Sequence, residues 1–182
     1  MIKYTCTEEI GKNIKAALRW LSKDPVRDNL RFVHVFDGVM YAIDGRCMGY
    51  TKLPSGGKAS PLIPDGAYHV VPVTKCWFYF MPADVKLMDK ELLLNVVTPK
   101  VDATFTENAD SIVHRLAQKG VWINAEFIKK ATGTHKIADV YYHSENKGDK
   151  AVVVVCGGVS VVMMPIMHMD ESIEKACGGL PE

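Results

Sequence analysis

Histidine and cysteine, which often act as nucleophiles, bases or metal ligands, are scattered along this chain of 182 residues. The six histidines lie at positions 34, 69, 114, 135, 143 and 168, without an HExxH motif or a close carboxylate partner. The five cysteines, of which no two have CxxC spacing, are Cys6, Cys47, Cys76, Cys156 and Cys177. These patterns predict no catalytic nucleophile, no metal site and no cofactor, so we expect a protein that is not an enzyme.

The segment SGGKAS at residues 55–60 is the nearest match to a phosphate-binding loop. The GxxxxGK[ST] motif needs an earlier glycine, but Lys52 and Leu53 stand in that part of the segment. The sequence PLIP that follows cannot begin the helix whose N-terminus would face the phosphates. We therefore do not expect a nucleotide site in this loop.

A row of cations is the more promising feature. In a helix predicted over residues 5–24, four cations fall on one stripe about 80° wide, opposite the apolar side chains. They are Lys12, Lys15, Arg19 and Lys23. A later predicted helix adds Lys129 and Lys130, and Lys136 follows it. Two interpretations stay open: a solvated helix face, or a row of phosphate contacts that hold nucleic acid without reading its sequence.

The composition is that of an ordinary globular protein, with 48% hydrophobic and 24% charged residues. The net charge of +1 gives no general basic field, so any nucleic-acid site must come from local clustering of cations. An odd number of cysteines without CxxC pairs favours a reducing compartment. The N-terminus has no apolar core of a signal peptide, and we expect a cytoplasmic protein.

Two Asp-Gly pairs lie seven residues apart between apolar runs, at Asp37-Gly38 and Asp44-Gly45. Asp-Gly is a strong hairpin signal, because a type I′ turn needs positive φ at both central residues. The sequence therefore predicts a three-stranded meander over residues 30–53.

The least polar stretch, residues 151–167, carries no charge and raises the alternative of a membrane span. It is shorter than the ~20 residues that a spanning helix needs, and Gly157-Gly158 interrupts it. Valine is β-branched and favours strands. We therefore predict a hairpin with strands at 151–156 and 159–164.

The predicted elements repeat one order, a strand, a helix and three strands, about three times. Helices are predicted at residues 5–24, 74–81 and 125–132. Further strands are predicted at residues 67–73, 85–89, 91–97, 101–107, 120–124 and 137–144, while residues 108–119 suit either a helix or a loop. This hairpin-rich layout predicts an α+β fold, with helices on one face of antiparallel sheets.

Three segments, in this order, resemble the DNA polymerase III beta subunit family, the bacterial DNA sliding clamps. They are LRFVHVFDGVMYAIDGRCMGY, then YHVVPVTKCWFYF, then WINAEFIKKATG together with VVMMPIM, and they cover roughly two thirds of the chain. The family's Thr-Asp-Gly-His-Arg-Leu turn corresponds to residues 43–48, and its Val-Met-Pro-Met strand to residues 162–166. Arg46 and Cys47 replace the family's histidine and arginine, which suggests a shortened, phage-type relative.

The resemblance implies the sliding-clamp fold and a protein that tethers a polymerase or another replication protein to duplex DNA, without sequence preference. The chain has about half the length of a beta subunit, so a ring requires a homo-oligomer. We expect a clamp-like domain of two units over residues 1–118, a third unit over 119–170 and a flexible tail over 171–182. The alternative is a clamp-fold module that does not encircle DNA and binds peptides of replication proteins.

The resemblance also implies two sets of site residues. Cations on the helices would face DNA: Lys12, Lys15, Arg19, Lys23, Lys129, Lys130 and Lys136. In the family, the final hairpin and the middle-domain turn line an apolar pocket for short peptides, which here would comprise Gly45, Arg46, Met48, Met164, Pro165 and Ile166. The alternative for the methionine-rich end is that it is simply part of the core.

Overall fold

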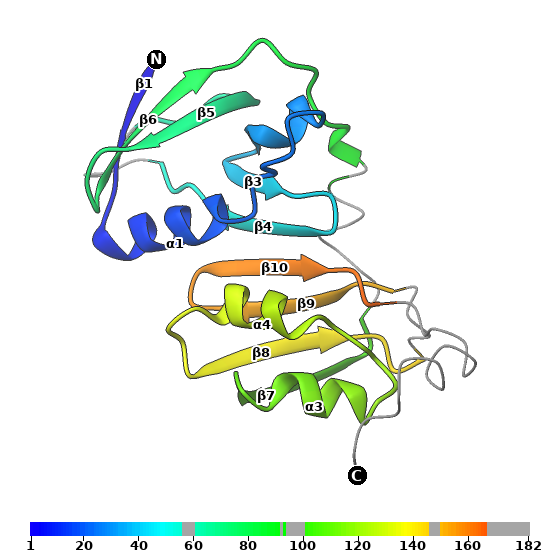
Figure 1. Cartoon of the computed structure of the whole chain (residues 1–182). Helices are drawn as coiled ribbons and strands as arrows, with labels where there is room; N and C mark the ends of the chain where they lie inside the picture. Colours follow the sequence, from blue (N-terminus) through cyan, green and yellow to red (C-terminus); the bar gives the residue numbers. More distant parts are fainter. Residues whose placement is uncertain (56–60, 92, 94–100, 146–149, 167–182) are drawn as a thin grey trace.

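The computed structural model describes residues 1–55, 61–91, 93, 101–145 and 150–166 (Figure 1). The first part of the chain contains β1 (Ile2–Thr5), α1 (Glu8–Leu18), the short 3₁₀ helix η1 (Asp28–Arg31), β2 (Val33–Phe36), β3 (Val39–Ile43), β4 (Cys47–Lys52), β5 (Gly66–Pro72) and β6 (Trp77–Pro82). The second part contains β7 (Ala103–Asn108), α3 (Ile112–Ala117), α4 (Ala125–Thr132), β8 (Ile137–Tyr142), β9 (Val152–Cys156) and β10 (Val159–Met163).

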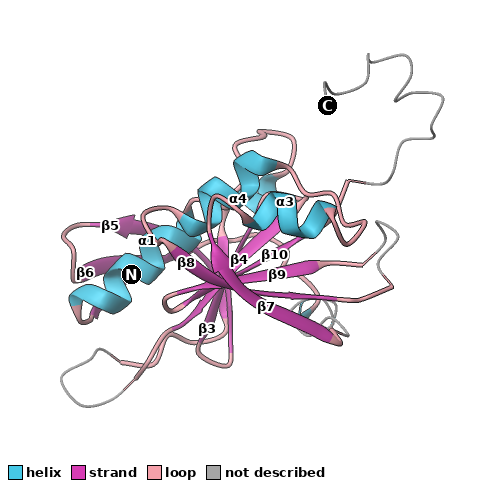
Figure 2. Cartoon of the chain, turned by 90° about the horizontal axis from the view of Figure 1, so that it is seen from below, coloured by secondary structure: helices cyan, strands magenta, loops and turns pink. Residues whose placement is uncertain are grey.

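The ten strands in the described residues form one antiparallel sheet in the order β1-β6-β5-β2-β3-β4-β10-β9-β8-β7. The two parts of the chain meet in the middle of this sheet, where β4 pairs with β10 from Ser160 opposite Tyr50 to Met163 opposite Cys47 (Figure 1). Helices α1, α3 and α4 lie on one side of the sheet (Figure 2). The predicted α+β class, with helices on one face of an antiparallel sheet, is confirmed.

Helix α1 begins where the sequence offers a cap and ends before Arg19. The Thr7 hydroxyl accepts the backbone N–H of Ile10 at 3.3 Å, and Glu8 and Glu9 complement the positive helix N-terminus. A Cβ atom on Gly11 would overlap the carbonyl of Lys75, so a glycine is required where α1 packs on the turn before β6. The helix is shorter than predicted, and Lys23 lies beyond its end.

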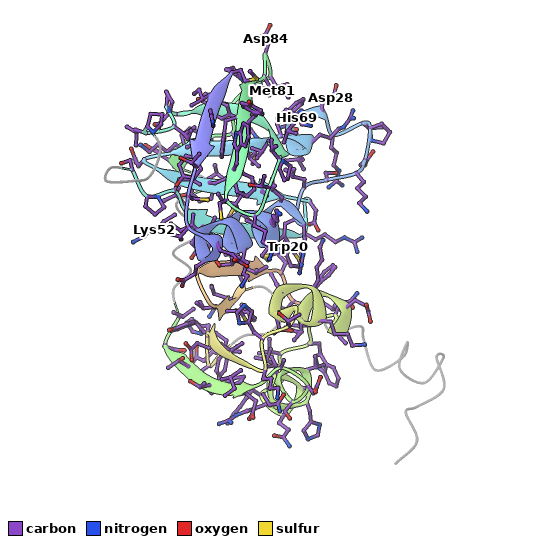
Figure 3. All side chains as sticks on the ribbon, turned by 90° about the vertical axis from the view of Figure 1, so that its left-hand side faces the viewer. Trp20, Asp28, Lys52, His69, Met81 and Asp84 are labelled. Atoms are coloured by element: carbon purple, nitrogen blue, oxygen red, sulfur yellow. The ribbon has the colours of Figure 1, made fainter. Side chains whose placement is uncertain are left out.

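Trp20 packs at the place where the two parts of the chain join. Its side chain is 1% exposed and lies against Gly49 of β4, where any Cβ would overlap the indole ring. Phe127 of α4 meets the same ring edge-on at 6.2 Å between centroids, and Lys130 Nζ lies 4.0 Å from its centroid. Figure 3 shows Trp20 between the level of α1 and that of α4. One side chain therefore holds both helices against the central strands.

The hairpin predictions are confirmed. The meander is β2, β3 and β4, and the final hairpin is β9 and β10, joined by a turn in which Gly157 has a φ of 58°. Helix α4 and strands β5, β7 and β8 also lie where the sequence placed them, and the ambiguous residues 108–119 contain α3.

The helix predicted at residues 74–81 is wrong, because β6 occupies most of this segment. Phe78 and Phe80 are fully buried, whereas Trp77 and Tyr79 point to the other face and are half-buried. Burial that alternates from residue to residue is typical of a strand, and β6 pairs with β1 on one side and with β5 on the other.

Two predicted strands are also wrong. Residues 120–124 are not part of the sheet, although Val121 and Ile123 pack into the core before the Asn124 cap of α4. Residues 85–89 form no strand. The strand predicted at 91–97 lies largely outside the described residues.

The order of a strand, helix and three strands is complete twice in the described chain, in β1–β4 with α1 and in β7–β10 with α3 and α4. In the middle unit of the three that were predicted, β6 stands where the helix at 74–81 was expected, and β5 and β6 extend the first part of the sheet. The boundary at residue 118 stays a prediction, and β7 before it pairs with β8 after it. Residues 171–182 lie outside the described residues.

A buried histidine ties two loops to β2. His34 is fully buried; its Nε2 lies 2.9 Å from the carbonyl oxygen of Asn29, and its Nδ1 accepts the backbone N–H of Met88 at 3.5 Å. This arrangement requires a neutral ring with the proton on Nε2. Burial lowers the pKa of His34, and the bond to Asn29 opposes this shift only in part.

We predict that His34 makes folding pH-dependent. Because its pKa is lower in the folded state, the unfolded chain takes up a proton first as the pH falls through about 6.5. The contribution of His34 to stability is therefore complete above this pH, and between pH 7.5 and 5.5 it falls by up to about 1.4 kcal/mol. Urea unfolding of the wild type and His34→Gln at both pH values measures the difference.

The matched control for this prediction is His69→Gln, because His69 lies exposed on β5. It should keep the wild-type pH dependence. If His34→Gln loses stability between the two pH values as much as the wild type does, the effect belongs to other groups.

Candidate functional site

A mainly apolar cavity of about 270 Å³ lies where the β3–β4 turn meets the end of β10. Its lining comprises Leu30, Ile43, Gly45, Arg46, Cys47, Met48, Met88, Leu93, Val162 and Met164. Met48 and Val162 belong to a small apolar cluster, whereas the buried side chains of α1 and α4 pack in a separate and larger core. The cavity is therefore on the face of the sheet that α1, α3 and α4 do not cover.

The turn that forms one wall is held by a single carboxylate. Asp44 Oδ1 accepts the backbone N–H groups of Arg46 and Cys47, at 2.9 and 2.8 Å. Gly45, between Asp44 and Arg46, has a φ of 93°, a conformation that favours glycine. The Asp-Gly pair thus sets the shape of the turn and holds the backbone of the cavity rim.

The second wall follows from the pairing of β4 with β10. Met48 is directly opposite Val162, and the ladder continues beyond the strand with the backbone N–H of Met164 donating to the carbonyl of Arg46 at 3.3 Å. This bond places Met164 beside the turn. Its side chain is 48% exposed, while Met163 before it is fully buried.

The structure brings four of the six predicted pocket residues into the lining of one cavity: Gly45, Arg46, Met48 and Met164. Pro165 is buried next to the cavity but does not line it. Ile166 is 49% exposed, and its backbone N–H donates to the carbonyl of Trp122 at 2.8 Å. The predicted binding of a peptide at this place remains a hypothesis.

The sequence did not predict the third part of the cavity lining. Leu30, Met88 and Leu93 come from segments that no turn signal or motif connects to the hairpins. His34 joins these segments physically, because its two hydrogen bonds reach Asn29, next to Leu30, and the backbone of Met88. It is a positioning residue for the cavity rather than part of its lining.

Five of the seven predicted cations line two clefts of the helical face, and Lys129 and Lys136 line neither. Lys12, Lys15 and Arg19 line a cleft of about 390 Å³ with His135 from the loop after α4. Arg19, Lys23 and Lys130 line a broader, open cleft with Arg31 and His69. Arg19 borders both, so the cations of α1 and α4 share one side of the molecule.

Part of this positive charge is neutralised within the protein. Lys12 pairs with Glu8 at 3.5 Å and Lys129 with Glu126 at 3.2 Å, both at exposed positions. Lys130 pairs with Asp44 at 3.7 Å. The other predicted DNA-binding residues, for which the described part of the chain holds no ion pair, are Lys15, Arg19, Lys23 and Lys136.

Within the described residues, no three side chains of His, Cys, Asp or Glu lie close enough to hold a metal ion together. The helices described here are all too short or too polar to cross a membrane. The apolar stretch that raised the membrane alternative forms β9 and β10 of the sheet.

The fold is that of bacterial DNA sliding clamps. A beta sliding clamp of C. crescentus matches 92% of this chain with a TM-score of 0.64 and 13% sequence identity. The DNA polymerase III beta chain of Streptococcus pneumoniae matches 92%, with a TM-score of 0.61 and 9% identity. The Helicobacter pylori beta clamp, solved with a bound DNA ligase peptide, matches 91% with a TM-score of 0.60 and 12% identity.

In each of these three comparisons, this chain covers 65% of the solved clamp. No protein-family model matches the sequence. The search of curated proteins also found no match. At these identities the solved structures establish the fold.

Proposed function

We propose that this protein is a sliding-clamp-like tether, which binds duplex DNA without reading its sequence and holds a polymerase or another replication protein through a short peptide. The observation that carries the proposal is the apolar cavity at the junction of β4 and β10. This cavity is part of a sliding-clamp fold, and one solved clamp with this fold binds a DNA ligase peptide. The tether performs no catalysis of its own.

The chemistry of the cavity suits a peptide with apolar anchors. Its volume of about 270 Å³ is just below the range of roughly 300–1,000 Å³ for ligand sites, which supports binding of a few side chains rather than a whole cofactor. Met48, Met88 and Met164 give it flexible, polarisable walls that can adapt to different partners. Arg46 on the rim can pair with a carboxylate of the peptide.

The helical face supports the DNA part of the proposal. Lys15, Arg19, Lys23 and Lys136 have no ion pair in the described chain and can contact phosphates, whereas Lys12, Lys129 and Lys130 would first have to leave their carboxylate partners. The cavity is on the opposite face of the sheet, so DNA and peptide would not compete for the same surface. A net charge of +1 implies weak binding, and binding through phosphate contacts should depend strongly on salt.

Encircling DNA requires several copies of this chain. Strands β1 and β7 are the outermost strands of the sheet, and a strand of another copy could extend it at either edge. We further propose that this protein forms a homo-oligomer in the cytoplasm. We also propose that it is a shortened relative of the beta subunit, of the type that phages carry.

A second candidate function is a clamp-fold module that binds peptides of replication proteins without encircling DNA. The ion pairs of Lys12, Lys129 and Lys130 favour it, because they reduce the charge available to DNA. The cavity is common to both functions. DNA binding and the oligomeric state therefore separate the two candidates.

We predict that Met164→Ala and Met48→Ala each weaken a bound peptide by roughly 1–2 kcal/mol, because each removes apolar contact in the cavity. The probe is the fluorescein-labelled DNA ligase peptide that binds the H. pylori clamp, measured by anisotropy. Met81→Ala, a half-buried methionine of β6 outside the cavity, is the matched control. Unchanged affinity of folded Met164→Ala would exclude this cavity as the peptide site.

We predict that Lys15→Glu with Arg19→Glu weakens binding to a short duplex and reduces the slope of log K against log salt by about 2. Anisotropy titrations with labelled duplexes of two unrelated sequences, at several salt concentrations, measure both effects. Lys52→Glu with Lys86→Glu makes the same charge change at exposed lysines outside the helices. If both double variants lose affinity equally, general charge rather than the helical face binds the DNA.

A further inference from the structure

Two cysteines face each other where the first strand of the sheet ends. The ladder between β1 and β6 pairs Thr5 with Trp77, and one step further along places Cys6 opposite Cys76. The backbone N–H of Cys6 donates to the carbonyl of Cys76 at 2.9 Å, so the pairing continues through this step. Cys6 Sγ lies 3.7 Å from the same carbonyl oxygen.

This position meets the requirement that a disulfide sets for the distance between Cα atoms. Directly opposite residues of an antiparallel pair point to the same face, with Cα atoms about 5.5 Å apart at a hydrogen-bonded pair. Disulfides span Cα separations of about 4.4–6.8 Å. The Cβ atoms of a hydrogen-bonded pair lie about 5.5 Å apart, whereas a disulfide needs about 3.5–4.5 Å, so the end of β1 would have to draw slightly closer to β6 for the bond to form.

The two thiols are also more accessible than the other described cysteines. Cys6 and Cys76 are partly exposed, whereas Cys47 and Cys156 are buried in β4 and β9. Strand β10 lies between β4 and β9 in the sheet, so these buried cysteines have no cysteine opposite them. The fifth cysteine, Cys177, lies outside the described residues.

We propose that Cys6 and Cys76 are a reversible modification site, which forms a cross-strand disulfide by exchange with a low-molecular-weight disulfide such as oxidised glutathione. The Cys76 thiolate attacks one sulfur of glutathione disulfide and releases one glutathione thiolate. The Cys6 thiolate then attacks Sγ of Cys76 in this mixed disulfide and releases the second. The two cysteines lose two protons and two electrons, and the glutathione disulfide is reduced to two thiols.

The surroundings favour this order of attack. Burial raises the pKa of the Cys6 thiol, and the neighbouring Cys76 raises it further when it is charged. Once the Cys76 sulfur is part of a mixed disulfide, it carries no thiolate charge, so this second effect disappears and Cys6 ionises more readily. Cys6 is then held next to the sulfur that it must attack.

The cross-link would fasten an outermost strand and the start of α1. Cys6 and Cys76 are 70 positions apart, so the bond closes a long loop in the unfolded chain. Thr7, which caps α1, follows Cys6 directly, and Gly11 in the first turns of α1 packs on Lys75. Oxidation would therefore fix the N-terminal end of the helical face against the turn before β6.

The test uses the full chain in buffers of reduced and oxidised glutathione at increasing ratios of the oxidised form. We expect the protein to lose the mass of two hydrogen atoms, and the five thiols to fall to three. A non-reducing peptide map should join the Cys6 and Cys76 peptides, and the melting temperature should rise by roughly 10 °C. Reduction with dithiothreitol should reverse all of these changes.

Three single variants make the test specific. Cys6→Ser and Cys76→Ser should each abolish the cross-link, with Cys6→Ser retaining a mixed disulfide with glutathione at Cys76. Cys177→Ser removes a thiol elsewhere in the chain and should behave as the wild type. The proposal is overturned if the folded protein keeps all its thiols in oxidising buffer, or if the peptide map joins Cys6 or Cys76 to any other cysteine.

Discussion

The ladder between β4 and β10 is the interaction on which the rest of the structure depends. It makes one sheet from two parts of the chain that are far apart in sequence. Trp20 seals this junction from the helical side, and it fits because β4 has a glycine, Gly49, directly beneath the ring. Without the junction, the turn before β4 and the end of β10 would not meet, and the apolar cavity would not exist.

Asp44 connects the two faces of the sheet at this junction. One of its oxygens holds the backbone of the turn that borders the cavity, and the other is 3.7 Å from Lys130 of α4. Lys130 in turn lies over Trp20. The helical face, with its cations, and the opposite face, with its cavity, are thus built around shared residues. Charge that α4 presents to solvent is reduced by the same residue, Asp44, that supports the rim of the cavity.

Local signals in the sequence predicted the hairpins, and residues of these hairpins form two walls of the cavity. The pairs Asp44-Gly45 and Gly157-Gly158 mark turns in which Gly45 and Gly157 have a positive φ that few other residues adopt, so the meander and the final hairpin could be located. The resemblance to the beta subunit then related the turn to the strand ending at Met164. The pairing of β4 with β10 confirms that these two segments are adjacent.

The wrong or missing predictions concern a segment with ladder partners on both sides and residues that meet only through contacts distant in sequence. A short apolar segment such as residues 74–81 fits a helix or a strand, and its ladder partners on β1 and β5 determine which one forms. Leu30, Met88 and Leu93 reach the cavity through tertiary contacts, in part through the buried ring of His34. No spacing in the sequence reveals such contacts.

The molar mass of the protein in solution tests the central claim most directly, because a tether that encircles DNA must contain several copies of a chain of this length. Light scattering at micromolar concentration, with and without duplex DNA, should show a closed oligomer with a mass that is a fixed multiple of 20.2 kDa. A mass of one chain under both conditions would contradict the encircling tether.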